Sequence, residues 1–423
     1  MATRMGKRYR YYVLVVLTLT STLNIADRLI MSILLEDIKA EFTMTDTQLG
    51  LLAGLAFALF YATLSIPIAR FADKNNRKNV LAAAVIVWSG MTALCGAATG
   101  FVSLFLARLG VGVGEAGGSP PTYSMIADYF KPSERARAMG VYTTGAVLGT
   151  GGGMMLGGYL AETIGWRLTF ISLGIPGILM GILLYFTVKE PIRGRFDKGT
   201  DEEKQATDFK ETLRSLASNK TFVGVSISFA MLTMVGYAMA VWLAPIMLRN
   251  FDVSVSKVGL YLGTAYFIGG IPGPLLGGFL TDFAVKYNAR WRAWIPAICI
   301  LGTVIAFWFC LRSTSLPAFL GFFTLAYAMF MLPQAPSMSL LQSSIGSGQR
   351  ALGVSFALLF NSLLGLALGP FLIGSMSDAF TPTYGSMALN YAVLSLCTAA
   401  AIIASLCYAW TASTMEAGPD KVS

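Results

Sequence analysis

The sequence contains no histidine and few charged residues of either sign. Asp, Glu, Lys and Arg make up 13% of the 423 residues, whereas about a quarter of an ordinary soluble domain is charged. Hydrophobic residues account for 55% of the chain, and its mean hydropathy is +0.64. Sparse charge combined with repeated apolar runs of about 20 residues indicates an integral membrane protein. With histidine missing, the carboxylates are the natural candidates for carrying protons.

Cysteine is scarce, and its spacing does not suggest a metal site. The five cysteines lie in apolar stretches without metal-ligand spacing and are interpreted as packing residues: Cys95, Cys299, Cys310, Cys397 and Cys407. A Gly-x-Gly-x-x-Gly pattern runs from Gly112 to Gly117, but it lies inside an apolar segment and not between a strand and a helix. We therefore expect no nucleotide site, no cofactor and no enzyme chemistry.

The apolar runs are predicted to be helices. A membrane-spanning segment must satisfy its own backbone, so it is either a helix or part of a closed barrel. Barrel strands alternate apolar and polar residues over about 10 positions, and a run such as VLAAAVIVWSGMTALCGAATGF shows no such alternation. We predict an all-α protein with twelve transmembrane helices near 11–35, 47–70, 79–99, 102–128, 137–161, 166–188, 221–247, 257–281, 293–312, 317–342, 352–376 and 384–410.

A single long polar interruption divides these helices six plus six. Its proline, glycine and charged residues predict an N-terminal six-helix bundle (1–188), a cytoplasmic linker with a short amphipathic helix (189–220) and a C-terminal six-helix bundle (221–423). The halves share local sequence, since RAMGV at 137–141 matches RALGV at 350–354. Duplicated halves of this kind are typical of secondary transporters.

The excess of positive charge follows the predicted topology. With the N-terminus inside, about 24 of the 31 Lys and Arg residues fall in cytoplasmic segments. We therefore expect an integral protein of the cytoplasmic (inner or plasma) membrane with both termini cytoplasmic. The expected partners are a small-molecule or lipid substrate and membrane lipids, with no nucleic acid, and the protein is expected to be a monomer.

The loop after the second predicted helix resembles a signature of the major facilitator superfamily. That signature reads Gly-x3-Asp-Arg-x-Gly-Arg-Arg, and residues 69–78 read ARFADKNNRK, with both glycines replaced. In the family, the acid and bases of this loop hold the two halves together at the cytoplasmic face. The resemblance thus implies a cytoplasmic gate that includes Asp73, Arg77 and, at the matching place in the second half, Asp282.

Two further motifs are similar to the Spinster branch of that superfamily. Members share Asn-x-x-Asp-Arg in the first helix, present here at 24–28, and Arg-x3-Gly-x-Gly-Glu-Ala in the fourth, present at 108–116. The branch is associated with lysophospholipids and sphingolipid-like substrates. The resemblance therefore implies a major facilitator fold and a lipid-like cargo.

Four ionisable residues lie clearly inside the predicted spans, namely Asp27, Arg28, Arg108 and Glu115. Each charge near mid-bilayer costs roughly 2.5–3.5 kcal/mol, so such residues face a cavity or one another. Arg108 and Glu115 are separated by about 10 Å along one helix and cannot pair directly. We expect a network that joins Arg28 to Glu115 and Asp27, with Arg108 able to compete. Burial favours a protonated carboxyl and a nearby arginine favours the ionised form, so we interpret these four residues as a proton-coupling and substrate site. A static ion pair that only fixes helix packing is the alternative.

The second half has a different character, because its spans carry aromatic side chains and no clear internal charge. An ionic wall facing an apolar, adaptable wall suits an anionic or zwitterionic amphiphile. The candidate cavity residues are Asn24, Ser119, Tyr142, Thr143, Trp242, Tyr327, Gln334, Phe356 and Asn361.

These observations predict a secondary active transporter that works by alternating access. We expect the proton gradient to drive it and an amphiphile, a lysophospholipid or sphingolipid-like molecule, to be its cargo. Alternatives are a proton-coupled transporter of small organic anions or drugs, a non-transporting membrane receptor and a lipid scramblase.

Overall fold

The computed structural model describes residues 6–196, 209–345 and 350–415, and every regular element in these ranges is helical. The first half contains α1 (Lys7–Phe42), α2 (Asp46–Gly50), the π-helical turn η1 (Leu51–Leu55), α3 (Ala56–Lys74), α4 (Arg77–Cys95), α5 (Phe101–Glu115), α6 (Ser119–Tyr129) and α7 (Pro132–Thr187). The second half contains α8 (Phe209–Ser218), α9 (Lys220–Asn250), α10 (Val255–Gly270), α11 (Pro272–Val285), α12 (Trp291–Arg312), α13 (Leu316–Met331), α14 (Gln334–Ser343), α15 (Arg350–Asn361), the π-helix η3 (Ser362–Leu368), α16 (Gly369–Tyr384), the short η4 (Gly385–Met387) and α17 (Ala388–Thr414).

Ten helical stretches among the described residues are long and apolar enough to cross a membrane. Two of them, Pro132–Thr187 with 56 residues and Gly353–Thr414 with 62, are long enough to cross twice, because one crossing needs about 20 residues. Each of the two contains a glycine with positive φ, Gly165 at 80° and Gly385 at 54°, a backbone conformation that favours glycine. The structure is therefore consistent with the twelve predicted spans.

The described residues pack as two compact units. Unit 1 draws on Met1–Met44, Leu51–Thr200 and Asp252–Gly263, and unit 2 draws on Thr45–Gly50, Asp201–Phe251 and Thr264–Ser423. Each unit thus includes a short segment from the other half of the sequence.

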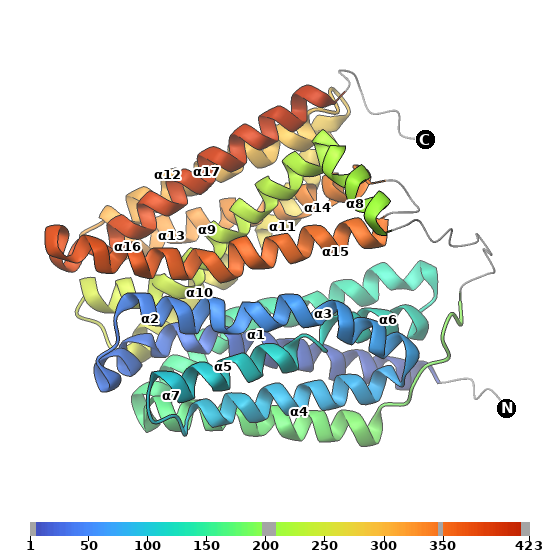
Figure 1. Ribbon diagram of the computed structural model, residues 1–423, viewed down its shortest axis with the longest axis horizontal. Coiled ribbons are helices and arrows are strands. Elements are labelled where there is room, and N and C mark those ends of the chain that lie inside the picture. The colour runs from blue at the N-terminus through green and yellow to red at the C-terminus, as the bar shows by residue number, and fades with distance from the viewer. Residues whose placement is uncertain (1–5, 197–208, 346–349, 416–423) are drawn as a thin grey trace. The chain divides into compact units, whose positions relative to one another are not determined.

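In unit 1, α1 lies along α7, and α4 packs against both α7 and α5 (Figure 1). A row of glycines on α7 makes the first contact possible. A β-carbon at any of four positions would meet α1 within van der Waals distance: Gly145, Gly149, Gly153 and Gly157 face Thr18, Thr22, Ala26 and Ile30 in turn. Because small residues let helix backbones approach closely, this row sets the position of α1, the helix that carries Asp27 and Arg28.

In unit 2, α17 packs against α9, α12 and α16, and α12 also packs against α13 (Figure 1). Ser337 and Tyr408 share a buried hydrogen bond of 2.6 Å between their hydroxyls, which joins α14 to α17. The short helix α8 contributes Leu216 to a buried cluster with Phe222 and Val225 of α9. This cluster attaches the short amphipathic helix to the unit.

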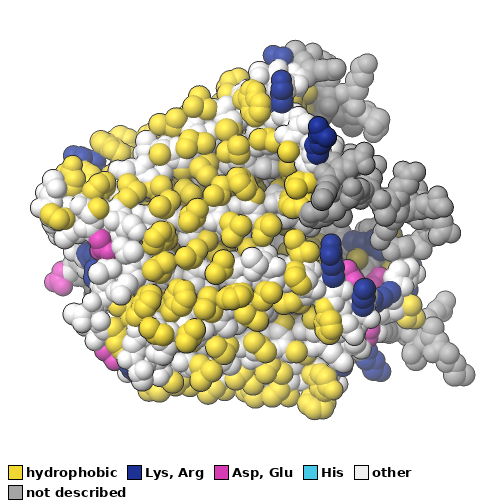
Figure 2. Space-filling view, viewed as in Figure 1, with side chains coloured by type: hydrophobic (Ala, Val, Ile, Leu, Met, Phe, Trp, Pro, Cys, Tyr) yellow, Lys and Arg dark blue, Asp and Glu magenta, His cyan; other side chains and the backbone are white. Residues whose placement is uncertain are grey.

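Much of the exposed surface of the helices is apolar. Hydrophobic side chains spread over the lengths of the helices on the face drawn in Figure 2, while charged side chains gather at helix ends. Large apolar side chains are well exposed, including Phe186 at 78%, Leu275 at 73% and Phe279 at 69%. A soluble protein rarely exposes so much contiguous apolar surface, whereas a membrane protein presents it to the bilayer.

Candidate functional site

Helices α1 and α5 of unit 1 bring Arg28 and Glu115 into direct contact. Arg28 Nε donates a hydrogen bond of 2.5 Å to Glu115 Oε2. The Arg28 side chain is 14% exposed and that of Glu115 is fully buried. Asn24, one turn before Arg28, also hydrogen-bonds the Glu115 side chain. The contact between Arg28 and Glu115 that we expected from the cost of isolated charges inside the spans is therefore present.

Asp27 lies beside this pair but has its own partner on α4. Thr92 donates its hydroxyl to Asp27 Oδ2 at 3.3 Å, and Asp27 Oδ1 has no hydrogen-bond partner among the described residues. The buried Asp27 carboxyl also interacts electrostatically with Glu115 and Arg108. Sequence reasoning missed Thr92, whose only signal was a hydroxyl in an otherwise apolar stretch of helix.

Arg108 is buried and incompletely bonded. Its Nε reaches the backbone oxygen of Leu52, in η1, at 3.5 Å, which is the outer limit of a hydrogen bond. Within the described part of the chain, Arg108 Nη1 and Glu115 Oε1 have no hydrogen-bond partner. Buried polar groups without partners are uncommon in native proteins and call for an explanation, often a functional one.

Two aromatic rings from α3 cover the Arg28 guanidinium. Arg28 Cζ lies 4.8 Å from the ring centroid of Phe57 and 4.7 Å from that of Tyr61. The two rings stack at 5.3 Å with 21° between their planes. Sequence reasoning did not include either residue, although their spacing of four places them on one face of a helix.

The site is therefore a charge-balanced cluster of two acids and two arginines. Asp27 and Glu115 offset Arg28 and Arg108, and the whole cluster lies on helices of unit 1. Across the described ranges, no three His, Cys, Asp or Glu side chains gather as they would around a metal ion. Such a cluster can bind and release protons, and an arginine freed from its carboxylate can bind an anion.

Comparison with known proteins identifies the family. The model of the Major Facilitator Superfamily matches residues 16–370. The chain belongs to the major facilitator superfamily. It is 31% identical to an "MFS-type efflux pump" of Mycolicibacterium smegmatis, over 97% of this chain and 94% of that one. It is also 25% identical to the "Sphingosine-1-phosphate transporter SPNS2" of Danio rerio, over 96% of this chain and 85% of the relative.

Solved structures place this facilitator close to the Spinster branch. A bacterial homologue of the human lysosomal transporter Spinster, inward-facing and unoccupied, matches with a TM-score of 0.85 and 31% identity over 97% of each chain. A bacterial homologue of Spinster in the inward-facing and occupied conformation matches with a TM-score of 0.81 and 31% identity. The predicted all-α major facilitator fold, the Spinster resemblance and the assignment as a transporter instead of an enzyme are confirmed.

Three of the other predicted cavity residues of the facilitator lie in unit 1. The Tyr142 hydroxyl hydrogen-bonds Ser21 of α1, and the Tyr142 ring lies 5.6 Å from that of Tyr123. Ser119 begins α6. The Thr143 hydroxyl donates to the backbone oxygen of Gly140, in its own helix, at 2.9 Å. Tyr142 thus connects to the helix that carries Arg28.

The remaining predicted cavity residues are distributed over four helices of unit 2. Trp242 of α9 is completely buried and donates its Nε1 hydrogen to the backbone oxygen of Pro370 at 3.2 Å. The Tyr327 ring of α13 lies 4.6 Å from that of Tyr266. Gln334 begins α14, while Phe356 and Asn361 lie on α15. Trp242 therefore packs inside the unit, and Asn361 Oδ1 is buried with no hydrogen-bond partner in the described ranges.

The predicted gate residue Arg77 makes its contacts inside unit 1. Its side chain bonds Asp128 of α6 at 2.5 Å and Glu190, just after α7, at 2.7 Å. It is 2% exposed, whereas Asp73 at the end of α3 and Asp282 on α11 are both exposed. Arg77 thus ties the start of α4 to the start of the linker. The proposed gating role of the three residues stays a prediction.

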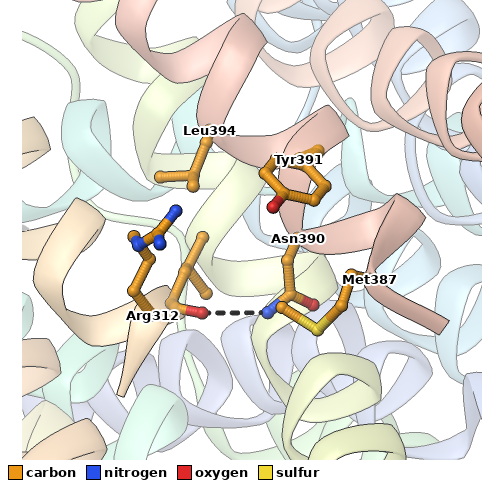
Figure 3. Close-up of a pocket in the computed structure, with 6 residues that line it drawn as sticks. Arg312, Met387, Asn390, Tyr391 and Leu394 are labelled. Carbon is orange, nitrogen blue, oxygen red and sulfur yellow. Dashed lines mark hydrogen bonds between the residues drawn. The ribbon is translucent and has the colours of Figure 1, made fainter. Parts of the chain in front are cut away.

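A separate small pocket lies in unit 2 where α12 ends and α17 begins (Figure 3). Its volume is about 110 Å³, and its lining residues are Leu311, Arg312, Met387, Asn390, Tyr391 and Leu394. Asn390 Nδ2 donates to the backbone oxygen of Leu311 at 3.0 Å, the dashed line of Figure 3. Sites for drug-sized ligands usually measure roughly 300–1,000 Å³. The pocket is therefore too small to hold an amphiphilic cargo.

Proposed function

We propose that this major facilitator protein is a proton-coupled transporter of single-chain amphiphiles with anionic or zwitterionic head groups. Lysophospholipids and sphingolipid-like molecules are the cargo class, and alternating access is the mechanism. The protein resides in the cytoplasmic membrane with both termini on the cytoplasmic side. One observation carries the proposal: the buried 2.5 Å contact between Arg28 and Glu115.

Proton coupling follows from the exchange of partners that this contact allows. An ionised Glu115 holds Arg28, and protonation of Glu115 weakens that hold because the carboxyl loses its charge. The freed guanidinium then needs another anion, since an unpaired charge inside a membrane protein is costly. A phosphate-bearing head group meets that need. Proton binding and cargo binding are thereby linked at one arginine.

The head-group chemistry is supported by the residue that receives it. A guanidinium presents several donors in a planar fork that matches a phosphate, and it is more weakly hydrated than an ammonium. The Danio rerio relative is named for sphingosine-1-phosphate, which is such an amphiphile.

Transport of drugs or small organic anions is a second candidate. It is favoured by the efflux pump of Mycolicibacterium smegmatis, which is 31% identical to this chain over nearly its whole length. The same arginine could receive a small carboxylate or an anionic drug. The two candidates differ in whether the cargo needs an alkyl chain.

Reconstitution into liposomes separates these candidates. With an imposed pH gradient, we expect uptake of a fluorescent lysophospholipid and little uptake of a short-chain anion with the same head group. Flux of the short-chain anion alone would refute the amphiphile proposal. Scrambling would instead be bidirectional and insensitive to the gradient.

Glu115→Gln tests the coupling itself. We expect this variant to fold and to lose gradient-driven uptake, because the amide cannot take up the proton. Glu41→Gln is the matched control. Glu41 lies away from the site, near the end of α1, and its exposed carboxylate forms an ion pair of 2.5 Å with Arg167. Gradient-driven uptake by Glu115→Gln equal to that of the control would disprove proton coupling through Glu115.

A further inference from the structure

One buried ring lies within reach of both arginines of the charged site. The Phe57 ring centroid is 4.8 Å from Arg28 Cζ and 5.6 Å from Arg108 Cζ. Phe57 is 1% exposed, so these contacts are shielded from water. A guanidinium within about 6 Å of an aromatic centroid is attracted by the ring quadrupole, and the attraction is strongest where both are desolvated. Phe57 is thus a neutral partner shared by two like charges.

The backbone holds this ring in place. A β-carbon on Gly112 would overlap the backbone oxygen of Phe57, so α3 and α5 touch at this point. Gly112 lies four residues after Arg108 and three before Glu115, on the same face of α5. The turn that precedes Phe57 is the π-helix η1, which also provides the Leu52 oxygen that Arg108 reaches. Phe57 therefore cannot shift far relative to Arg108 and Glu115.

Tyr61 extends the ring surface by one helical turn. It stacks on Phe57 and lies 4.7 Å from Arg28 Cζ, but it is only partly buried. Arg28 is therefore positioned from two directions. Glu115 bonds its Nε, and two rings lie against the guanidinium carbon.

We infer that Phe57 is a positioning residue for the charged site. The Phe57 ring attracts both guanidinium groups and holds that of Arg28 against Glu115. The ring keeps Arg28 beside Glu115 even though a second cation competes for that carboxylate. The consequence for transport rests on the proposed function, because it assumes that Glu115 binds the proton. With the ring removed, Arg28 leaves Glu115 more readily and the carboxylate spends more time without its partner.

Carbodiimide labelling tests this without any cargo. The reagent dicyclohexylcarbodiimide reacts with protonated, apolar-buried carboxyls, so the rate at Glu115, read by peptide mass spectrometry, reports how often the residue is released from Arg28. We expect Phe57→Leu to raise the rate about tenfold, in line with the loss of a desolvated cation–π contact. Phe57→Tyr, which keeps the ring, should stay close to the wild-type rate.

A matched control separates positioning from packing. Phe170 is as buried as Phe57 and lies in unit 1, with the Trp166 ring at 6.1 Å. Phe170→Leu removes the same atoms from the core without changing the site and should leave Glu115 labelling unchanged. Should Phe57→Leu fail to fold, Tyr61→Leu can be compared with Tyr61→Phe at a partly exposed position. We then expect Tyr61→Leu to raise the labelling rate at Glu115 by less than about tenfold.

The outcomes distinguish this inference from the proposed function. The inference about Phe57 is overturned if Glu115 is labelled in Phe57→Leu at the wild-type rate, or if it is labelled as fast in Phe57→Tyr as in Phe57→Leu. An equal rise in the labelling rate in Phe170→Leu would overturn it as well. Absence of proton-driven flux in the wild-type protein would refute the proposed function instead, since the labelling comparison requires no transport.

Discussion

Asp46 and Arg249, far apart in the sequence, form a two-point ion pair within unit 2. Arg249 Nη1 donates to Asp46 Oδ2 at 2.8 Å, and Nη2 donates to Oδ1 at 2.7 Å. Ser377 adds a hydroxyl donor to Asp46 Oδ2 at 2.6 Å. The next residue, Asp378, accepts the backbone N–H groups of Asp46 and Thr47 at 3.0 and 2.8 Å. These bonds explain why Thr45–Gly50 packs with α9 and α16, although the chain continues from it into unit 1 on both sides.

Asp46→Asn should therefore destabilise the protein. The change leaves the Arg249 charge without its carboxylate in a largely buried place, where breaking an ion pair costs roughly 3–5 kcal/mol. Thermal unfolding in detergent, followed by tryptophan fluorescence, should show a lower Tm. Glu41→Gln, which breaks an exposed pair, should change Tm far less. Equal Tm values for the two variants would contradict a structural role for the Asp46 pair.

Arg28→Lys should weaken cargo binding while preserving the charge. A lysine lacks the planar fork that bonds a phosphate at two points and stacks less well on Phe57 and Tyr61. We expect KM for a lysophospholipid to rise about tenfold, equivalent to roughly 1.4 kcal/mol. Initial uptake rates over a range of lysophospholipid concentrations give KM. An unchanged KM would show that Arg28 does not contact the head group.

Thr92→Val should reduce proton-driven uptake by a few-fold. The substitution keeps the shape but removes the hydroxyl that donates to Asp27 at 3.3 Å, a bond worth about 1 kcal/mol. Thr92→Ser keeps the hydroxyl and serves as the control. Uptake under a fixed pH gradient is the measurement, and equal rates for the two variants would remove Asp27 from the coupling network.

Gly112→Ala should be destabilising, whereas Gly90→Ala should not. A methyl group at Gly112 would force α3 and α5 apart at Phe57, while Gly90 has nothing within 4 Å of the corresponding position. Overpacking of this kind costs roughly 1–3 kcal/mol, and an unhindered helical Gly→Ala change gains about 0.4–1 kcal/mol. The Tm values should therefore shift in opposite directions. A Gly112→Ala protein as stable as wild type would show that the two helices can separate freely at this point.

The amino-acid sequence by itself determined the class of protein and half of the site. Helical spans follow from run length and the absence of alternation, because these depend only on backbone satisfaction in lipid. Charges inside apolar helices face a cavity or one another, and Arg108 and Glu115 are too far apart along one helix to pair directly. That argument was sufficient to predict the contact between Arg28 and Glu115.

The tertiary structure alone decided which neutral residues complete the site and where short segments pack. Phe57, Tyr61 and Thr92 resemble dozens of other aromatic and hydroxyl residues in apolar helices, and only the approach of α3 and α4 to α1 and α5 singles them out. Arg77 belongs to a family motif that can be read in the sequence. Its ion pairs with Asp128 and Glu190, however, depend on how α6 and the end of α7 pack. The pairing of Asp46 with Arg249 likewise has no sequence signal, since both stand at helix ends where charge is ordinary. Local periodicity specifies the face on which a residue lies, but the identity of the partner on another helix is a property of packing.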